Sequence, residues 1–199
     1  MNNEEKILEL MKQNNGLITT KQIESENISR KTLLRLLDKK LIEREKRGLY
    51  VLPSSWGDEY YNLLFSVENA VFSYGTALYL LGISERVPLI YDVSVPVGFN
   101  VESIRKNEKI RLHYVKKEVF DLGKIEIESP QGQIVSCYDD ERSICDMIKD
   151  KESQDIEILK YAIKEYLNDK SRKDIMKLNE YAKALGVEKE LRNYLEVLL

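Results

Sequence analysis

The chain has 199 residues, of which 43% are hydrophobic, and this length and composition suffice for one large or two small domains with a buried core. No stretch approaches the roughly 18 uninterrupted apolar residues that a membrane-spanning helix needs. The N-terminus MNNEEKILEL is acidic and amphipathic rather than basic and then apolar, which excludes a typical export signal. We therefore expect a cytoplasmic protein without a membrane partner.

The formal net charge of −3 conceals an uneven distribution of charge along the chain. Residues 1–52 contain eleven Lys and Arg against eight Asp and Glu, a balance of +3, which leaves −6 for the remainder. Within the first part, residues 29–52 alone hold eight basic and three acidic residues. Because a phosphate backbone senses charge within a Debye length of about 10 Å, this local excess outweighs the acidic total.

The N-terminal region predicts two helices and a turn. Residues 4–13 carry a helical apolar stripe that ends at the turn formers 14–16. Thr19 or Thr20 then caps a short helix that ends near Asn27, with Gln22 in the capping-box position relative to Thr19.

Residues 29–52 predict a basic helix followed by a basic hairpin. Ser29 is the expected N-cap, and the helix should end near Lys40. Helical spacing puts the four leucines at 33, 34, 36 and 37 on one arc, and Lys31, Thr32, Arg35 and Lys39 opposite. A turn at residues 46–48 joins two short strands, since Gly48 is free to adopt positive φ.

Helix, short helix, turn, basic helix and hairpin together have the order of a winged helix-turn-helix, which normally binds DNA in the major groove. Arg35 and Lys31 have donors that suit guanine edges, whereas Arg30 is expected to anchor a phosphate. The alternative is a helical module with a charged, solvated face. The candidate DNA-binding residues are Arg30, Lys31, Thr32, Arg35, Lys39, Arg44, Lys46 and Arg47.

The turn-rich segment at residues 53–58 is the expected linker, so we divide the chain into domains 1–55 and 56–199. In the second domain the pattern predicts helices at 59–68 and 74–81 and strands at 89–97, 110–115, 124–128 and 133–138. Four helices follow at 140–149, 155–167, 171–185 and 188–198. The expected fold class is α+β, with a small, mostly antiparallel sheet flanked by helices.

Catalytic motifs are weak in this sequence. It contains no Walker loop, no G-x-G-x-x-G, no G-x-S-x-G and no H-E-x-x-H. Cys137, Cys145 and the single His113 cannot complete a zinc site without carboxylate help, and we interpret both cysteines as buried hydrophobes. We expect no catalytic residue, cofactor or metal.

One acidic and one basic cluster each allow both a functional and a structural interpretation. Asp139, Asp140, Glu141 and Asp146 could hold a hard cation, although acids in a first helical turn are more simply explained by the free amides there. The basic run at residues 105–117 could extend a DNA footprint or meet an acidic partner, or it could protect an edge strand from pairing.

Several segments resemble the AbiEi family of antitoxins from bacterial type IV toxin–antitoxin and phage-abortive-infection loci. They are GLITTKQIESENISRKTLLRLLDKKLIEREKRGLYVLP at 16–53, FSYGTALYLLGISERVP at 72–88 and YDDERSICDMIKD at 138–150. The tail NEYAKALGVEKELRNYLEVLL is also similar, so the resemblance spans nearly the whole chain.

This resemblance implies a repressor of its own operon that binds inverted repeats in the promoter. It also implies that the second domain neutralises a co-encoded nucleotidyltransferase-like toxin without a stable complex. Two alternatives remain at this stage: a ligand-responsive winged-helix repressor, and a metal-dependent nucleic-acid enzyme that uses the acidic cluster.

Overall fold

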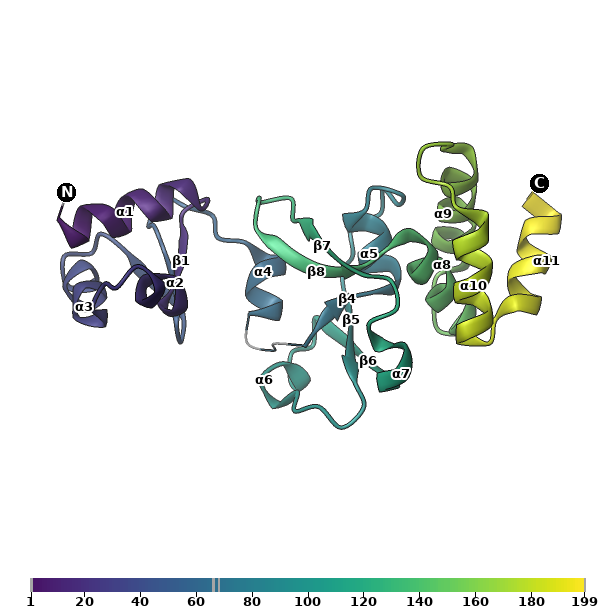
Figure 1. Cartoon of the computed structure of the whole chain (residues 1–199), viewed down its shortest axis with the longest axis horizontal. Coiled ribbons are helices and arrows are strands. Elements are labelled where there is room, and N and C mark those ends of the chain that lie inside the picture. Colours follow the sequence, from purple (N-terminus) through teal and green to yellow (C-terminus); the bar gives the residue numbers. More distant parts are fainter. Residues whose placement is uncertain (1, 66, 68, 199) are drawn as a thin grey trace. The chain divides into compact units, whose positions relative to one another are not determined.

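A computed structural model describes residues 2–65, 67 and 69–198 (Figure 1). The chain forms two compact units, Met1–Asn62 with Glu128–Gln133, and Leu63–Ile127 with Ile134–Leu199. The functional division at residue 55 stays a prediction. Among the described residues, no helix is long and apolar enough to cross a membrane.

The first unit consists of three helices and a small antiparallel sheet with strand order β1-β3-β2. Its elements are α1 (Asn3–Gln13), β1 (Leu17–Thr19), α2 (Thr20–Ser25), α3 (Arg30–Asp38), β2 (Glu43–Lys46) and β3 (Leu49–Val51). The order is consistent with a helix-turn-helix followed by a hairpin. Strand β1 was not expected, because three residues are too few to show an alternating pattern.

The helix starts in this unit follow the capping residues in the sequence. The expected capping box at α2 is confirmed, since Thr19 Oγ1 accepts from the Gln22 amide at 3.1 Å and the Thr19 amide donates to Gln22 Oε1 at 2.8 Å. Ser29 Oγ accepts from the Lys31 amide at the start of α3. Asn27 makes the turn between α2 and α3 with φ +57°, a left-handed conformation that asparagine tolerates.

The apolar faces of α1, α2 and α3 form one core. Its buried members are Ile7, Met11, Ile18, Ile23, Ile28, Leu33, Leu36 and Ile42. Burial of these side chains fixes which face of α3 points outward.

The buried face of α3 is rotated from its expected position. Thr32 is only 2% exposed, alongside Leu33 and Leu36, whereas Leu34 is 58% exposed. The expectation that Thr32 faces outward and Leu34 inward is therefore wrong. The side chains at 32, 33 and 36 share one stripe because residues three and four apart are neighbours on a helix. For the same reason Leu34 lies with Lys31 and Arg35 on the opposite, outward stripe.

The second unit contains a five-stranded sheet with order β6-β5-β4-β8-β7. The strands are β4 (Val71–Phe72), β5 (Tyr91–Pro96), β6 (Ile110–Val115), β7 (Lys124–Glu128) and β8 (Ile134–Tyr138). The sheet is mixed rather than mostly antiparallel: β4 pairs antiparallel with β5, but β5 and β6 are parallel and so are β4 and β8. The segment between β5 and β6 contains α6 (Glu102–Arg105) and is long enough to return the chain to the same direction.

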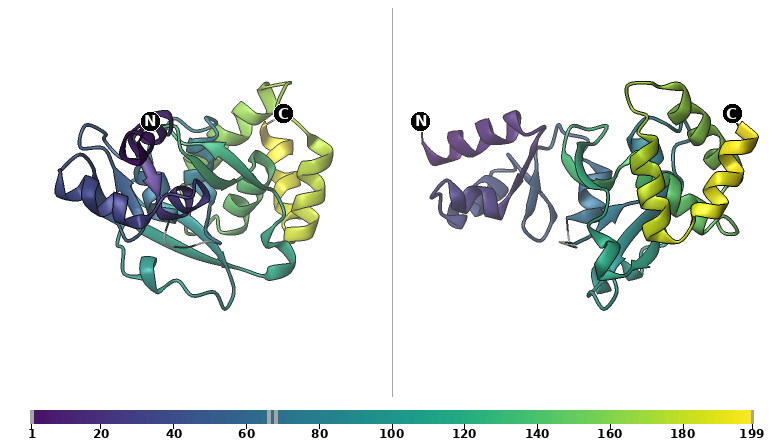
Figure 2. Two further views of the ribbon diagram at one scale, coloured as in Figure 1. Left: turned by 60° about the vertical axis from the view of Figure 1, so that its left-hand side comes forward. Right: turned by 45° about the vertical axis from the view of Figure 1, so that its right-hand side comes forward.

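Helices flank this sheet, as the α+β class predicts. They are α4 (Glu59–Leu64), which crosses from the first unit, α5 (Tyr74–Leu80), α7 (Lys117–Phe120), α8 (Asp140–Lys149), α9 (Ile156–Asn168), α10 (Ile175–Leu185) and α11 (Glu188–Leu198). Within the second unit, α5 contacts β5 as well as α8 and α9, and α10 packs beside α8 and α11 (Figures 1 and 2). Ser66 and Glu68, in the helix expected at 59–68, lie outside the described residues.

The rotation of α3 predicts opposite outcomes for two neighbouring substitutions. Thr32→Lys should lower the free energy of unfolding by about 2 kcal/mol or more, because a lysine there has no room to reach water without disturbing the core. Leu34→Lys should change it by less than about 0.5 kcal/mol. Urea unfolding followed by circular dichroism measures both, and equal effects would contradict the observed orientation.

Candidate nucleic-acid interface

Four of the expected DNA-binding residues are exposed cations without an ion-pair partner in the described part of the chain. Lys31 and Arg35 lie on the outward face of α3, and Arg44 and Arg47 lie on β2 and at the turn of the β2–β3 hairpin. Their charged groups are available to an external anion, since no carboxylate of the described residues competes for them. These cations come from the two elements that a winged helix-turn-helix would present to DNA.

Two further candidates are exposed but paired at the surface. Arg30 Nε forms an ion pair with Glu24 Oε1, and Lys39 Nζ lies 2.6 Å from Glu4 Oε2. Exposed pairs of this kind contribute only about 0–1 kcal/mol, so phosphate could replace either carboxylate at small cost.

The last two candidates have structural roles. Thr32 is buried against the core of the unit, which removes it from the outward face. Lys46 Nζ donates to the backbone carbonyl of Asn62, and burial lowers the pKa of this lysine. Asn62 also donates from Nδ2 to Glu45 Oε1 at 2.9 Å, so β2 is fastened to the start of the following segment. A DNA contact by Lys46 would require this bond to open.

The outward face of α3 contains two residues that helical spacing alone did not assign to it. Leu34 lies between Lys31 and Arg35, and Asp38 follows one turn later and is also exposed. A leucine here can contact a thymine methyl group, whereas Asp38 would repel phosphate and could accept from a cytosine amino group. The sequence signal that could have identified this outward face is the helical spacing of residues 32, 33 and 36, provided that Thr32 is counted as a core residue.

Comparison with known proteins bears on the same segment. Residues 5–53 match the model of a family described as transcriptional regulator, AbiEi antitoxin. The match covers α1 through β3 and confirms, over these residues, the resemblance to the AbiEi family. No curated protein sequence matches the chain.

A family of regulators and antitoxins fits a role without catalysis. The alternative, a metal-dependent nucleic-acid enzyme, depends on the acidic cluster of α8, so the contacts of these carboxylates are informative. Arg172 forms a bidentate ion pair with Asp140, in which Nε donates to Oδ2 at 2.9 Å and Nη2 donates to Oδ1 at 2.8 Å. Lys177 Nζ lies 3.0 Å from Asp139 Oδ2 and 2.9 Å from Glu141 Oε2. These carboxylates are therefore neutralised by residues from the segment before α10 and from α10 itself.

The fourth carboxylate of the cluster is deeper. Asp146 is 3% exposed and accepts from Arg142 Nε at 3.0 Å. Among the described residues, no group of three or more His, Cys, Asp or Glu side chains has the arrangement of a metal site. Three of the four acids thus link α8 to α10 or to the segment before it, and Asp146 is paired within α8, which favours the structural interpretation of the cluster.

The two cysteines behave as the sequence predicted. Cys137 and Cys145 are free and fully buried. Burial raises the pKa of both thiols, which keeps them in the unreactive protonated form.

The burial of Asp146 predicts a pH-dependent stability. Burial raises the pKa of Asp146 from 3.8 to about 6, although Arg142 opposes this. The folded chain then binds this proton more tightly than the unfolded chain, so the free energy of unfolding should fall as pH rises from about 4 to about 6. At 1.36 kcal/mol per pKa unit, the loss amounts to about 1–3 kcal/mol.

Asp146→Asn removes this titration, so its stability relative to the wild type should improve by that amount between pH 4 and pH 7. Urea unfolding of both proteins at four pH values across this range gives the comparison. Parallel stability curves would contradict the assignment.

Proposed function

We propose that the protein is an antitoxin and transcriptional autorepressor. It binds inverted repeats in its own promoter through α3 and the β2–β3 hairpin, and it neutralises a co-encoded nucleotidyltransferase-like toxin. One observation carries the DNA-binding part: four cations without an ion-pair partner among the described residues lie on these two elements, within the segment that matches a family of transcriptional regulators.

In this proposal α3 enters the major groove. Lys31 and Arg35 donate to guanine edges, and Leu34 between them contacts a thymine methyl group. Arg44 and Arg47 on the hairpin bind phosphate oxygens, while Arg30 and Lys39 exchange their surface carboxylates for phosphates. The basic run at residues 105–117 can add phosphate contacts, although Arg111 is already engaged with Asp92 at 3.5 Å.

The second unit carries the antitoxin function, acting on the toxin without a stable complex. The paired carboxylates of α8 support this assignment over a metal-dependent enzyme, because a cation would have to displace Arg172, Lys177 and Arg142 from their partners. Assays with nucleotides and magnesium address the enzyme directly. Turnover that is lost in both Asp140→Asn and Asp146→Asn would favour the enzyme and count against the antitoxin.

Arg35→Ala should weaken operator binding by about 1–3 kcal/mol and relax the sequence preference at one base pair, because a base contact is lost. Fluorescence anisotropy with the operator and with single-base variants measures both effects. Lys12→Ala on the exposed side of α1 is the matched control and should bind as the wild type does. If Arg35→Ala weakened all sequences equally, Arg35 would be a phosphate contact instead.

Arg47→Ala at the hairpin turn should retain the sequence preference and reduce the salt dependence of binding by about one unit of slope. The measurement is the affinity at several salt concentrations. An unchanged slope would remove the hairpin turn from the interface.

Neutralisation and repression should be separable. Arg35→Ala should still rescue growth when it is co-expressed from an independent promoter with the neighbouring toxin gene, because its second unit is intact. Growth after toxin induction and expression of a promoter reporter give the two readouts. Failure of the wild-type protein to rescue growth would overturn the antitoxin proposal, while loss of rescue in Arg35→Ala alone would show that the two functions share one surface.

A further inference from the structure

A cavity of about 490 Å³ lies wholly within the second unit, between the edge strand β6 and helices α5, α7, α8 and α10. This volume is within the roughly 300–1,000 Å³ of small-molecule sites. Apolar side chains line part of the cavity: Leu112, Val115, Val119, Ala184 and Leu185. The remaining walls are polar or aromatic, so the cavity offers both packing surface and directed hydrogen bonds.

Tyr74 is held in an unusual conformation at the wall of this cavity. It is the first residue of α5 and has φ +50°, a left-handed backbone that costs a bulky residue about 1–3 kcal/mol. Its hydroxyl donates to Asp150 Oδ2 at 2.5 Å, and its ring stacks on His113 with centroids 3.8 Å apart. A strained backbone of this kind persists only where the surrounding contacts hold the residue in place, and such positions are common in binding sites.

His113 lines the cavity, and among the described residues only one of its two ring nitrogens makes a hydrogen bond. Nε2 contacts Asp92 Oδ1 at 2.8 Å, and this carboxylate is itself 7% exposed. In the tautomer that donates from Nε2 to this carboxylate, Nδ1 carries the acceptor lone pair. The nearest acidic atom to Nδ1 is Asp150 Oδ2 at 3.9 Å, beyond hydrogen-bond distance.

The charges around the cavity leave a positive excess. Arg142 and Asp146 neutralise each other, and the Asp150 carboxylate offsets one of the remaining lysines, because the Tyr74 hydroxyl that donates to it is neutral. Lys116 and Lys149 also line the cavity, are exposed, and have no ion-pair partner in the part of the chain that the structure describes. The cavity therefore attracts an anion, and two ammonium groups can contact separate oxygens of a phosphate monoester, whose charge is about −1.5 to −2 at pH 7.

We propose that this cavity binds a small phosphorylated compound whose organic part donates hydrogen bonds, such as a nucleotide or a sugar phosphate. Lys116 and Lys149 hold the phosphate at the rim. Asp150 and His113 Nδ1 accept from hydroxyl or amino groups further inside, and the ring of Tyr114, which is 55% exposed, covers the organic part. This site is additional to the proposed DNA-binding and antitoxin functions and does not depend on either.

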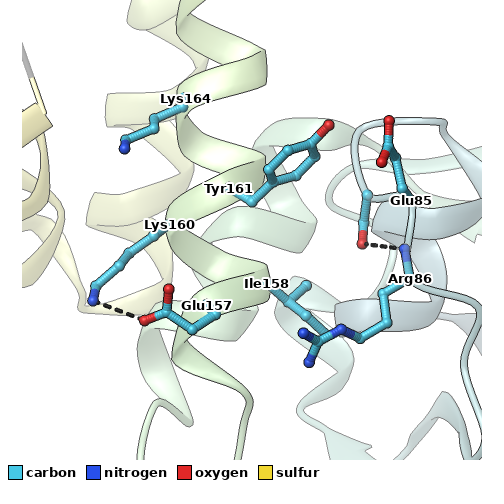
Figure 3. Close-up of a pocket in the computed structure, with 8 residues that line it drawn as sticks. Glu85, Arg86, Glu157, Ile158, Lys160, Tyr161 and Lys164 are labelled. Carbon is cyan, nitrogen blue, oxygen red and sulfur yellow. Dashed lines mark hydrogen bonds and ion pairs between the residues drawn. The ribbon is translucent and has the colours of Figure 1, made fainter.

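A second hollow in the same unit lacks these properties. It measures about 390 Å³ and lies between residues 84–86 and α9 (Figure 3). Arg86 is paired with Asp155 and Lys160 with Glu157, which leaves one lysine, Lys164, and one carboxylate, Glu85. Two exposed lysines and a net positive charge therefore distinguish the cavity beside β6.

The test is calorimetric titration of the full chain with four probes: adenosine 5′-monophosphate, ribose 5-phosphate, glucose 6-phosphate and inorganic phosphate. At least one organic phosphate should bind about tenfold more tightly than inorganic phosphate. The double variant Lys116→Ala/Lys149→Ala should weaken that binding about tenfold, whereas Lys170→Ala, an exposed lysine away from the cavity, should leave it unchanged.

His113→Gln distinguishes a built site from general attraction of anions. It should weaken the organic phosphate and leave inorganic phosphate unaffected, with an unchanged circular dichroism spectrum. Preference for adenosine 5′-monophosphate would identify the ligand as a nucleotide, and preference for ribose 5-phosphate or glucose 6-phosphate would identify it as a sugar phosphate. Binding of no probe at millimolar concentration, equal binding of inorganic phosphate, or insensitivity to the double lysine variant would each overturn the proposal.

Discussion

The second unit depends on one buried guanidinium. Arg142 is 1% exposed, and its donors reach Asp146 and the backbone carbonyls of Val119 and Leu122, at 3.0, 2.5 and 2.9 Å. The guanidinium carbon also lies 4.3 Å from the centre of the Tyr138 ring. A planar group with several fixed donors suits such a site better than a lysine ammonium would.

This anchoring of α8 determines what the rest of the unit can do. The first turn of α8 presents its carboxylates to Lys177 and Arg172, which holds α10 and the segment before it. The last turn delivers Lys149 and Asp150 to the cavity beside β6. Removing one partner of a buried pair leaves an uncompensated charge, so the helical layer and the cavity are both sensitive to this contact.

In the first unit the constraint is the packing of α3 on its neighbours. Because Thr32, Leu33 and Leu36 are buried, the outward stripe must contain Lys31, Leu34, Arg35 and Asp38. This stripe mixes cations with one apolar and one acidic side chain. A surface of that kind suits contacts with base edges better than a uniformly basic face, which attracts any phosphate backbone.

Much of the local structure could be predicted from the sequence. The capping residues Thr19 and Ser29 mark helix starts, and alternation located β6 and β7 at their observed bounds. Strand direction could not be predicted, because pairing between β5 and β6 depends on how the intervening segment folds rather than on either strand. The phase of α3 was missed because Thr32 is polar, yet a threonine can occupy a buried position beside leucines.

The cavity was also beyond sequence reasoning. Tyr74, Asp92, His113 and Asp150 come from four separate elements or loops, and no short motif links them. His113 in particular has the sequence context of an isolated strand histidine, and its contact with Asp92 depends on the pairing of β6 with the neighbouring strand β5.

The burial of both thiols has a practical consequence for spectroscopy. Alkylating dyes react with thiolates, and Cys137 and Cys145 are inaccessible and protonated. A cysteine introduced at the exposed position of Leu34 would therefore be the one site that a maleimide fluorophore labels. Quenching of such a dye by guanine would test in real time whether α3 approaches bases, without removal of either native cysteine.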